Sequence, residues 1–165
     1  MFHRFAESTR RIVFFARDQA LASHQSLIEP SHLLLGLIRL HPELFEENLH
    51  SGDPVRVGCE IETRSEQPAS GSKAADPRCS EELKRVLRNA DDEAAALYKH
   101  KTGRRRRLLG FLTMNAWVVE PCHLLLGLLS ESDCATAKTL VERGLTLQAA
   151  RERFSQSGYR ARNSP

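Results

Sequence analysis

The sequence predicts an all-α fold built as a tandem duplication of a four-helix repeat, with about eight helices in total. The segment Glu29-Pro-Ser-His-Leu-Leu-Leu-Gly-Leu-Ile recurs 91 residues later as Glu120-Pro-Cys-His-Leu-Leu-Leu-Gly-Leu-Leu, identical at eight of ten positions. Around both segments, apolar residues recur every three to four positions, and the alternation typical of strands is nearly absent. An offset this long indicates two copies of a helical unit rather than a solenoid. We call the two segments box 1 (29–38) and box 2 (120–129).

The first copy is expected over residues 1–63. Apolar spacing predicts a helix over 7–23, and box 1 opens a second helix in which Pro30 is tolerated because an amide hydrogen there would have no partner. Further helices are predicted over 42–49 and, less regularly, over 55–61. The apolar stripe of the first helix consists of Ile12, Val13, Ala16 and Ala20.

The second copy is expected over residues 80–154. Ser80 is the predicted N-cap of a long helix, and the acidic residues of its first turn complement the helix dipole. Pro121 takes the place of Pro30 in the box 2 helix. The apolar stripe of the long helix consists of Leu83, Val86, Leu87, Ala90, Ala94 and Leu97.

Two shorter helices are predicted after box 2. The first covers 134–143, with Asp133 as N-cap and Gly144 as the stop signal, and the second covers 146–154. The leucines of both boxes are expected in the core. The glycine inside each box is expected to let another helix approach closely, at a cost near 1 kcal/mol relative to alanine.

Three segments interrupt this symmetry. Residues 64–79 are rich in Ser, Ala, Pro and Gly and are predicted to be a linker. Residues 102–114 form a basic and apolar insert in the second copy, and 155–165 form a polar, basic tail. Trp117 is expected to be half-buried where the two copies meet.

Composition excludes several functional classes. The chain has 165 residues, a net charge of +3 and 41% hydrophobic residues, enough for a core without metal or disulfide support. No apolar run approaches the roughly 20 residues of a membrane span, and no signal peptide is visible, so a cytoplasmic protein is expected. The chain has no P-loop, nucleophile-elbow, zincin or dinucleotide motif, and its four cysteines have no CxxC spacing. We therefore predict no enzyme, cofactor or metal site.

With the boxes and the helix order in place, the chain resembles the N-terminal domain of the Clp unfoldases, most closely the ClpC type. The opening Met1-Phe-His-Arg-Phe is similar to the start of that domain, and each box is similar to its Gly-Thr-Glu-His-Ile-Leu-Leu-Gly-Leu signature. The resemblance covers residues 1–154. It implies two four-helix repeats related by a pseudo-twofold axis, which dock adaptors and substrates for an ATP-driven unfoldase and its protease.

Two features depart from the ClpC pattern. No AAA+ module follows, so we expect a stand-alone domain that binds an unfoldase, an adaptor or a client but unfolds nothing itself. ClpC-type domains also have an acidic residue directly before each box histidine, which holds the guanidinium of phosphoarginine. Ser31 and Cys122 occupy those positions here. Phosphoarginine recognition is therefore not carried over from the family.

A carboxylate still lies near the start of each box helix, at Glu29 and Glu120. Each can pair with a cationic group of a client, while the free amides of the helix N-terminus can receive a phosphate. The alternative is that each glutamate only complements its own helix dipole. The candidate client-binding residues are Glu29, Ser31, His32, Glu120, Cys122 and His123.

The box histidines are interpreted as structural residues that brace a helix start. Neighbouring residues of a helix point about 100 degrees apart, so Cys122 and His123 are poorly placed to share a proton, and no catalytic residue is predicted. A thiol at a helix N-terminus can still be activated, which makes Cys122 a candidate reactive cysteine.

A basic cluster in the insert offers a second candidate site, consisting of Arg104, Arg105, Arg106, Arg107 and the nearby Phe111. Three interpretations stand: a solvated loop, contact with nucleic-acid phosphates, or docking to an acidic protein surface helped by the adjacent apolar residues. We predict a non-catalytic protein-binding module that regulates or feeds an ATP-dependent protease system. Nucleic-acid binding through the arginines is the alternative.

Overall fold

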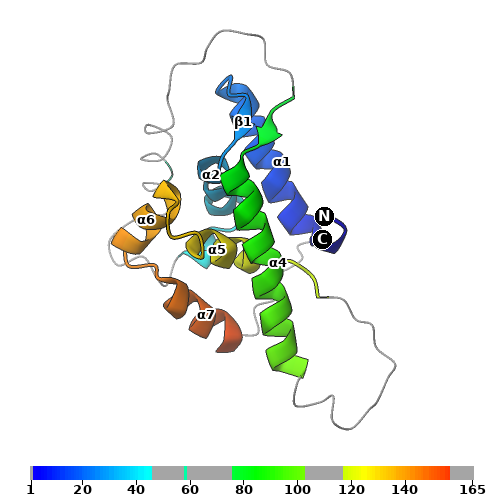
Figure 1. Cartoon of the computed structure of the whole chain (residues 1–165), viewed down its shortest axis with the longest axis vertical. Coiled ribbons are helices and arrows are strands. Elements are labelled where there is room, and N and C mark those ends of the chain that lie inside the picture. The colour runs from blue at the N-terminus through cyan, green and yellow to red at the C-terminus, as the bar shows by residue number, and fades with distance from the viewer. Residues whose placement is uncertain (1, 46–57, 59–75, 103–116, 157–165) are drawn as a thin grey trace.

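The computed structural model describes residues 2–45, 58, 76–102 and 117–156, and these are mostly helical (Figure 1). The N-terminal half contains η1 (Phe2–Arg4), α1 (Glu7–Ala22), β1 (Leu27–Ile28), α2 (Pro30–Leu40) and η2 (Pro42–Leu44). The C-terminal half contains β2 (Arg78–Cys79), α4 (Glu81–Thr102), α5 (Pro121–Leu129), α6 (Ala135–Glu142) and α7 (Leu147–Gln156).

The two box helices, α2 and α5, form the centre of the core. α2 packs against α1, α5 packs against α4, and the two box helices contact each other. Burying eight leucine side chains contributes roughly 1.5–3 kcal/mol for each. All eight are less than a tenth exposed: Leu33, Leu34, Leu35, Leu37, Leu124, Leu125, Leu126 and Leu128.

The box glycines allow the close helix approach that the sequence predicts. A Cβ at Gly36 would lie 3.0 Å from the carbonyl oxygen of Ile12 on α1. A Cβ at Gly127 would lie 2.5 Å from the carbonyl oxygen of Val86 on α4. Each box helix therefore rests directly on the backbone of the long helix that precedes it.

Short extended segments link the two halves of the chain. β1 pairs in parallel with β2, with Ile28 opposite Cys79, and the Ser80 N–H donates to the Ile28 carbonyl oxygen at 3.0 Å. At the other box, the Ala6 N–H donates to the Val119 carbonyl oxygen, also at 3.0 Å. In both places the residue just before a box glutamate bonds to the segment that leads into the other half's long helix. The all-α prediction omits these pairings because two-residue strands are too short to show an alternating pattern.

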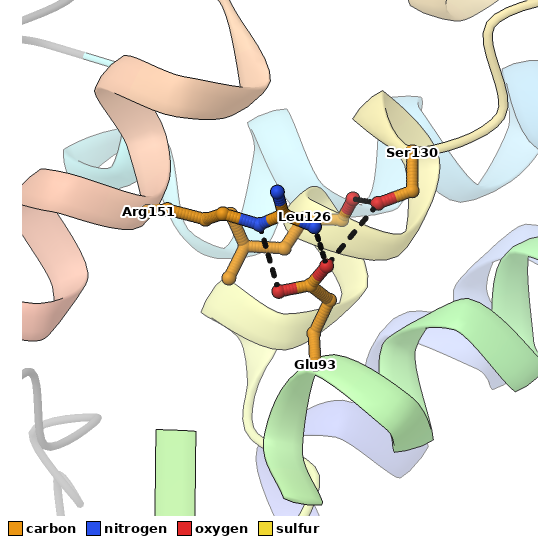
Figure 2. Close-up of polar contacts among 4 residues, drawn as sticks. All are labelled: Glu93, Leu126, Ser130 and Arg151. Atoms are coloured by element: carbon orange, nitrogen blue, oxygen red, sulfur yellow. Dashed lines mark hydrogen bonds and ion pairs between the residues drawn. The ribbon is translucent and has the colours of Figure 1, made fainter. Parts of the chain in front are cut away.

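A polar network holds α7 to α4 (Figure 2). The carboxylate of Glu93 on α4 receives two hydrogen bonds from the guanidinium of Arg151 on α7, one of them from Nε at 3.1 Å. Ser130 at the end of α5 donates to the Leu126 carbonyl oxygen at 2.9 Å and lies 3.4 Å from the same carboxylate. The Glu93 side chain is only 11% exposed, so the carboxylate of this pair is largely shielded from solvent.

Several sequence predictions of helices are confirmed within the described residues. α1 and α7 begin and end within about two residues of expectation, and α2, α4 and α5 begin where expected. Ser80 caps α4, since its Oγ accepts the Leu83 N–H at 3.0 Å. Gly144 has φ 94° and ends α6 as predicted. Trp117 is half-buried.

Other expectations are tested only in part. Of the expected eight helices, six α-helices lie in the described residues. The predicted helix over 42–49 is described only to residue 45, and the described part forms the 3-10 turn η2. The predicted helix over 55–61 lies outside the described residues except for Gly58. The predicted linker over 64–79 is described from residue 76, and its last two residues form β2.

The sequence predicted Asp133 as the N-cap of α6, and this prediction is wrong. Cys134 holds that position, and no side chain caps the helix. The Cys134 N–H donates to the Glu131 carbonyl oxygen at 3.1 Å, so a tight turn over 131–134 delays the start of the helix by one residue. Among the described residues, no helix is long and apolar enough to cross a membrane.

Candidate functional site

Both box helices begin with the same backbone arrangement. Glu29 precedes α2 in an extended conformation (φ −104°, ψ 165°), and Glu120 precedes α5 in nearly the same one (φ −96°, ψ 167°). A proline follows each glutamate at the first helical position, where its fixed φ suits the helix. Each box glutamate is therefore the N-cap of its own helix.

The glutamate and the histidine three residues later form a capping box in each copy. The Glu29 N–H donates to Nδ1 of His32 at 3.0 Å, and the Glu120 N–H donates to Nδ1 of His123 at 2.9 Å. In return, each carboxylate faces the backbone N–H of the histidine. A glutamate or glutamine usually fills the third helical position of this motif, and a histidine fills it here. This geometry favours the helix-capping interpretation of the two glutamates.

His32 is held in one neutral form. Its Nδ1 accepts a hydrogen bond, so the ring proton resides on Nε2. The residue is 2% exposed, and this burial lowers its pKa. Among the described residues, neither Nε2 of His32 nor Oγ of the neighbouring Ser31 has a hydrogen-bond partner. The ring therefore braces the start of α2 and carries no charge at neutral pH.

The cysteines of the described residues show no sign of an activated thiol. Cys122 is 2% exposed, so its thiol lies inside the molecule and not at the surface. Burial raises the pKa of both the Cys79 and the Cys134 thiols. No group of three metal-binding side chains occurs in the described part of the chain. The burial of Cys122 does not favour the reactive thiol that a helix N-terminus suggests.

Of the second candidate site, Arg104, Arg105, Arg106, Arg107 and Phe111 lie outside the described residues. The insert predicted over 102–114 is described only at its first residue, where α4 ends.

Sequence reasoning missed a cluster beside box 2. The Trp117 Nε1–H donates to the Asp91 carboxylate at 2.8 Å, and the Arg4 guanidinium lies 4.1 Å from the centre of the indole ring. Arg4 also lies 3.9 Å from Asp91. The lone tryptophan before box 2 was the one feature of the sequence that could have indicated this cluster, since nothing in the local pattern connects residues 4, 91 and 117. The cluster fixes the segment that enters box 2.

The fold and the paired boxes have a counterpart among known families. The family model for the Clp repeat (R) N-terminal domain matches residues 4–117 of the chain. The chain belongs to this family. The matched region runs from η1 to the segment just before box 2 and includes box 1 with its capping Glu29. The resemblance read from the two boxes is confirmed.

Solved structures of the Clp N-domain fold cover nearly the whole chain. The N-terminal domain of the chaperone ClpD from Arabidopsis thaliana is 22% identical, with a TM-score of 0.61, covering 92% of this chain and 95% of that one. The Hsp104 N-terminal domain from Candida albicans is 16% identical, with a TM-score of 0.66 and coverages of 93% and 91%. A chain from structural investigations of a malarial protein secretion system is 20% identical, with a TM-score of 0.69 and coverages of 93% and 95%. At these identities the likeness establishes the fold alone.

Proposed function

We propose that this Clp N-domain is a non-catalytic docking module whose two box N-termini receive client or adaptor proteins and so feed or regulate an ATP-dependent protease system. The observation that supports it most is the repetition of one capped helix start, with a glutamate at its entrance, in both halves of the chain. A duplicated site suits bivalent binding, in which a second weak contact adds to the first.

The glutamates can serve a ligand while they cap their helices. An ionised carboxylate has about four acceptor positions, and the histidine N–H that it faces uses at most one of them. Glu29 is exposed and Glu120 is half-buried. A lysine or arginine of a client can therefore pair with each carboxylate by a charge-assisted hydrogen bond.

A Glu29→Gln/Glu120→Gln double variant tests this proposal. The side-chain amide oxygen of glutamine can still accept a backbone N–H at the N-cap, so the helix start is kept while the charge is removed. We expect the wild-type chain to recover an unfoldase, an adaptor or a defined client set from native lysate, and the double variant to recover much less. Glu7→Gln, at an exposed position of α1, is the matched control. Equal recovery by the double variant and the wild type would contradict a role for the two carboxylates.

The same experiment separates docking from nucleic-acid binding. A variant with Arg104, Arg105, Arg106 and Arg107 replaced by serine is compared with the wild type at two salt concentrations, and bound material is read by mass spectrometry and by absorbance at 260 nm. Protein capture that survives the change supports docking at the boxes. Recovery of nucleic acid that disappears with salt and with the arginines would establish the alternative function.

A further inference from the structure

Exposed apolar side chains stand at equivalent positions beside the two boxes. Leu27 is 44% exposed and Val118 is 50% exposed, and both are among the few large hydrophobic residues that the described surface displays. Each lies two positions before a box glutamate. The residues between, Ile28 and Val119, are buried at 4% and 0%. Single exposed apolar residues are common, but the same exposure at both copies of a duplicated motif calls for an explanation.

Each apolar residue shares a face with its glutamate. The backbone is extended at Glu29 (ψ 165°) and at Glu120 (ψ 167°), and alternate residues of an extended chain project to the same side. Ile28 projects into the core, so Leu27 and Glu29 project outward together. Val118 and Glu120 do the same around Val119. Each box is thus preceded by an apolar residue and a carboxylate in an i, i+2 arrangement.

The extended segments before the two boxes form backbone hydrogen bonds along one edge. The backbone groups of Val118 and Leu27 point toward the other edge. The Val119 N–H donates to the Arg4 carbonyl oxygen at 2.8 Å, and the Val119 carbonyl oxygen accepts the Ala6 N–H. The backbone groups of Val118 therefore point to the opposite edge. Leu27 has the same relation to Ile28, whose carbonyl oxygen bonds to β2. In the described residues the sheet contains β1 and β2 only, so β1 has no strand on its second edge (Figure 1).

Building on the proposed docking function, we infer that a client segment binds each box entrance as an added strand, with an apolar residue against Leu27 or Val118 and a lysine or arginine two positions away against Glu29 or Glu120. Backbone hydrogen bonds supply affinity in such strand addition, and alternate side chains supply specificity. The i, i+2 spacing of the site sets the same spacing in the client, because side chains of paired strands stand opposite each other.

The charges around the site agree with a cationic partner residue. Arg78 lies across from Leu27, but on the strand that occupies the other edge of β1, farther from an added strand than Glu29 is. At box 2 the equivalent arginine, Arg4, is engaged by Trp117 and Asp91. Of these charged residues, it is therefore the box carboxylate that lies on the face an added strand would share, in both copies.

Three fluorescein-labelled peptides in a serine and glycine background test the inference by fluorescence anisotropy with the whole chain. One has leucine and lysine two positions apart, the second has them adjacent, and the third has glutamate in place of the lysine. We expect the first peptide to bind roughly two- to fivefold more tightly than either of the others. Equal binding of all three, or no binding of the first, would overturn the inference.

The double variant Leu27→Ser/Val118→Ser is expected to lose roughly two- to fivefold in affinity for the first peptide. Both residues are exposed, so the variant should fold. Val141→Ser, at an equally exposed valine of α6 (48%), is the control and should bind like the wild type. Trp117 adjoins Val118 and reports on box 2 alone. Val118→Ser should therefore move the peptide-induced change in tryptophan emission to higher peptide concentration, whereas Leu27→Ser should leave it unchanged.

Different experimental results would contradict the strand-addition inference and the docking proposal. If the Leu27→Ser/Val118→Ser variant still captures the wild-type set of proteins from lysate and still binds the first peptide normally, strand addition is wrong and docking stands. If the wild-type chain captures no protein partner at all, the docking proposal itself fails.

Discussion

Gly127 of α5 lies directly against the backbone of α4 at Val86. A Cβ at this glycine would stand 2.5 Å from the Val86 carbonyl oxygen and 2.6 Å from the Ala90 amide nitrogen, and neither backbone group can rotate away. Gly127→Ala is therefore expected to destabilise the fold by about 2 kcal/mol or more, because overpacking outweighs the better helix propensity of alanine. Thermal unfolding followed by circular dichroism measures this loss.

Gly36→Ala at the equivalent place in box 1 is the matched comparison. The nearest backbone atom to its added Cβ would be 3.0 Å away, and the next contacts are side chains that can adjust. We expect its effect to stay within about 1 kcal/mol. A larger loss at Gly36 than at Gly127 would show that the two long helices are not packed as described.

The Arg151 pair with Glu93 should matter more than an ordinary surface ion pair. The hydrogen bonds that Arg151 donates to Glu93 raise the pKa of Arg151, and the Glu93 carboxylate is nearly buried. Arg151→Ala leaves that carboxylate poorly paired and should cost about 1–2 kcal/mol in chemical denaturation. Lys84→Ala breaks the exposed pair with Glu81 and should cost less than about 0.5 kcal/mol. Equal losses in the two variants would contradict the shielding of Glu93.

Stability should fall below neutral pH because of His32. Burial lowers its pKa in the folded state below the ordinary value of 6.5, so the unfolded chain takes up a proton first. The full contribution is present above about pH 6.5 and declines as the pH falls toward the folded-state pKa, by at most about 1.4 kcal/mol per pH unit. His32→Gln keeps an acceptor for the Glu29 N–H without titrating. Urea denaturation at pH 7.5 and 5.5 should therefore show a smaller pH effect in His32→Gln than in the wild type.

The C-terminal end of α1 can be stabilised by one substitution. His24 follows the helix with φ 54°, a left-handed conformation that suits glycine. Its N–H bonds to the Leu21 carbonyl oxygen at 3.0 Å, so the conformation is part of the helix stop. His24→Gly should raise stability by about 0.5–1 kcal/mol.

A comparison at the preceding residue checks the cause. Ser23 has φ −84°, where glycine relieves no strain. Ser23→Gly should lower the melting temperature while His24→Gly raises it. A decrease in both variants would mean that backbone strain at residue 24 is not the controlling factor.

Much of the helical framework could be predicted from local signals. Pro30 and Pro121 mark the starts of the box helices, Ser80 caps α4 and Gly144 ends α6, because each acts on the backbone of its own turn. The cap of α6 could not be assigned this way. Asp133 has a suitable side chain, but the turn closed by the Glu131 carbonyl oxygen decides where that helix begins.

The sequence by itself determined the repeated box, the box helices with their buried leucines, and the family resemblance, because these depend on residue type and spacing within about ten positions. Only the tertiary structure decided that Ile28 pairs with Cys79, that Glu93 holds Arg151, and that each box histidine returns to the N–H of its glutamate. Two of these contacts join residues about 50 to 60 positions apart, and the third depends on a side-chain rotamer. No local sequence pattern specifies a long-range contact or a side-chain rotamer. The exposure of Leu27 beside Glu29 was also decided by the tertiary structure, because Ile28 between them is buried in the core and its neighbours face the other way.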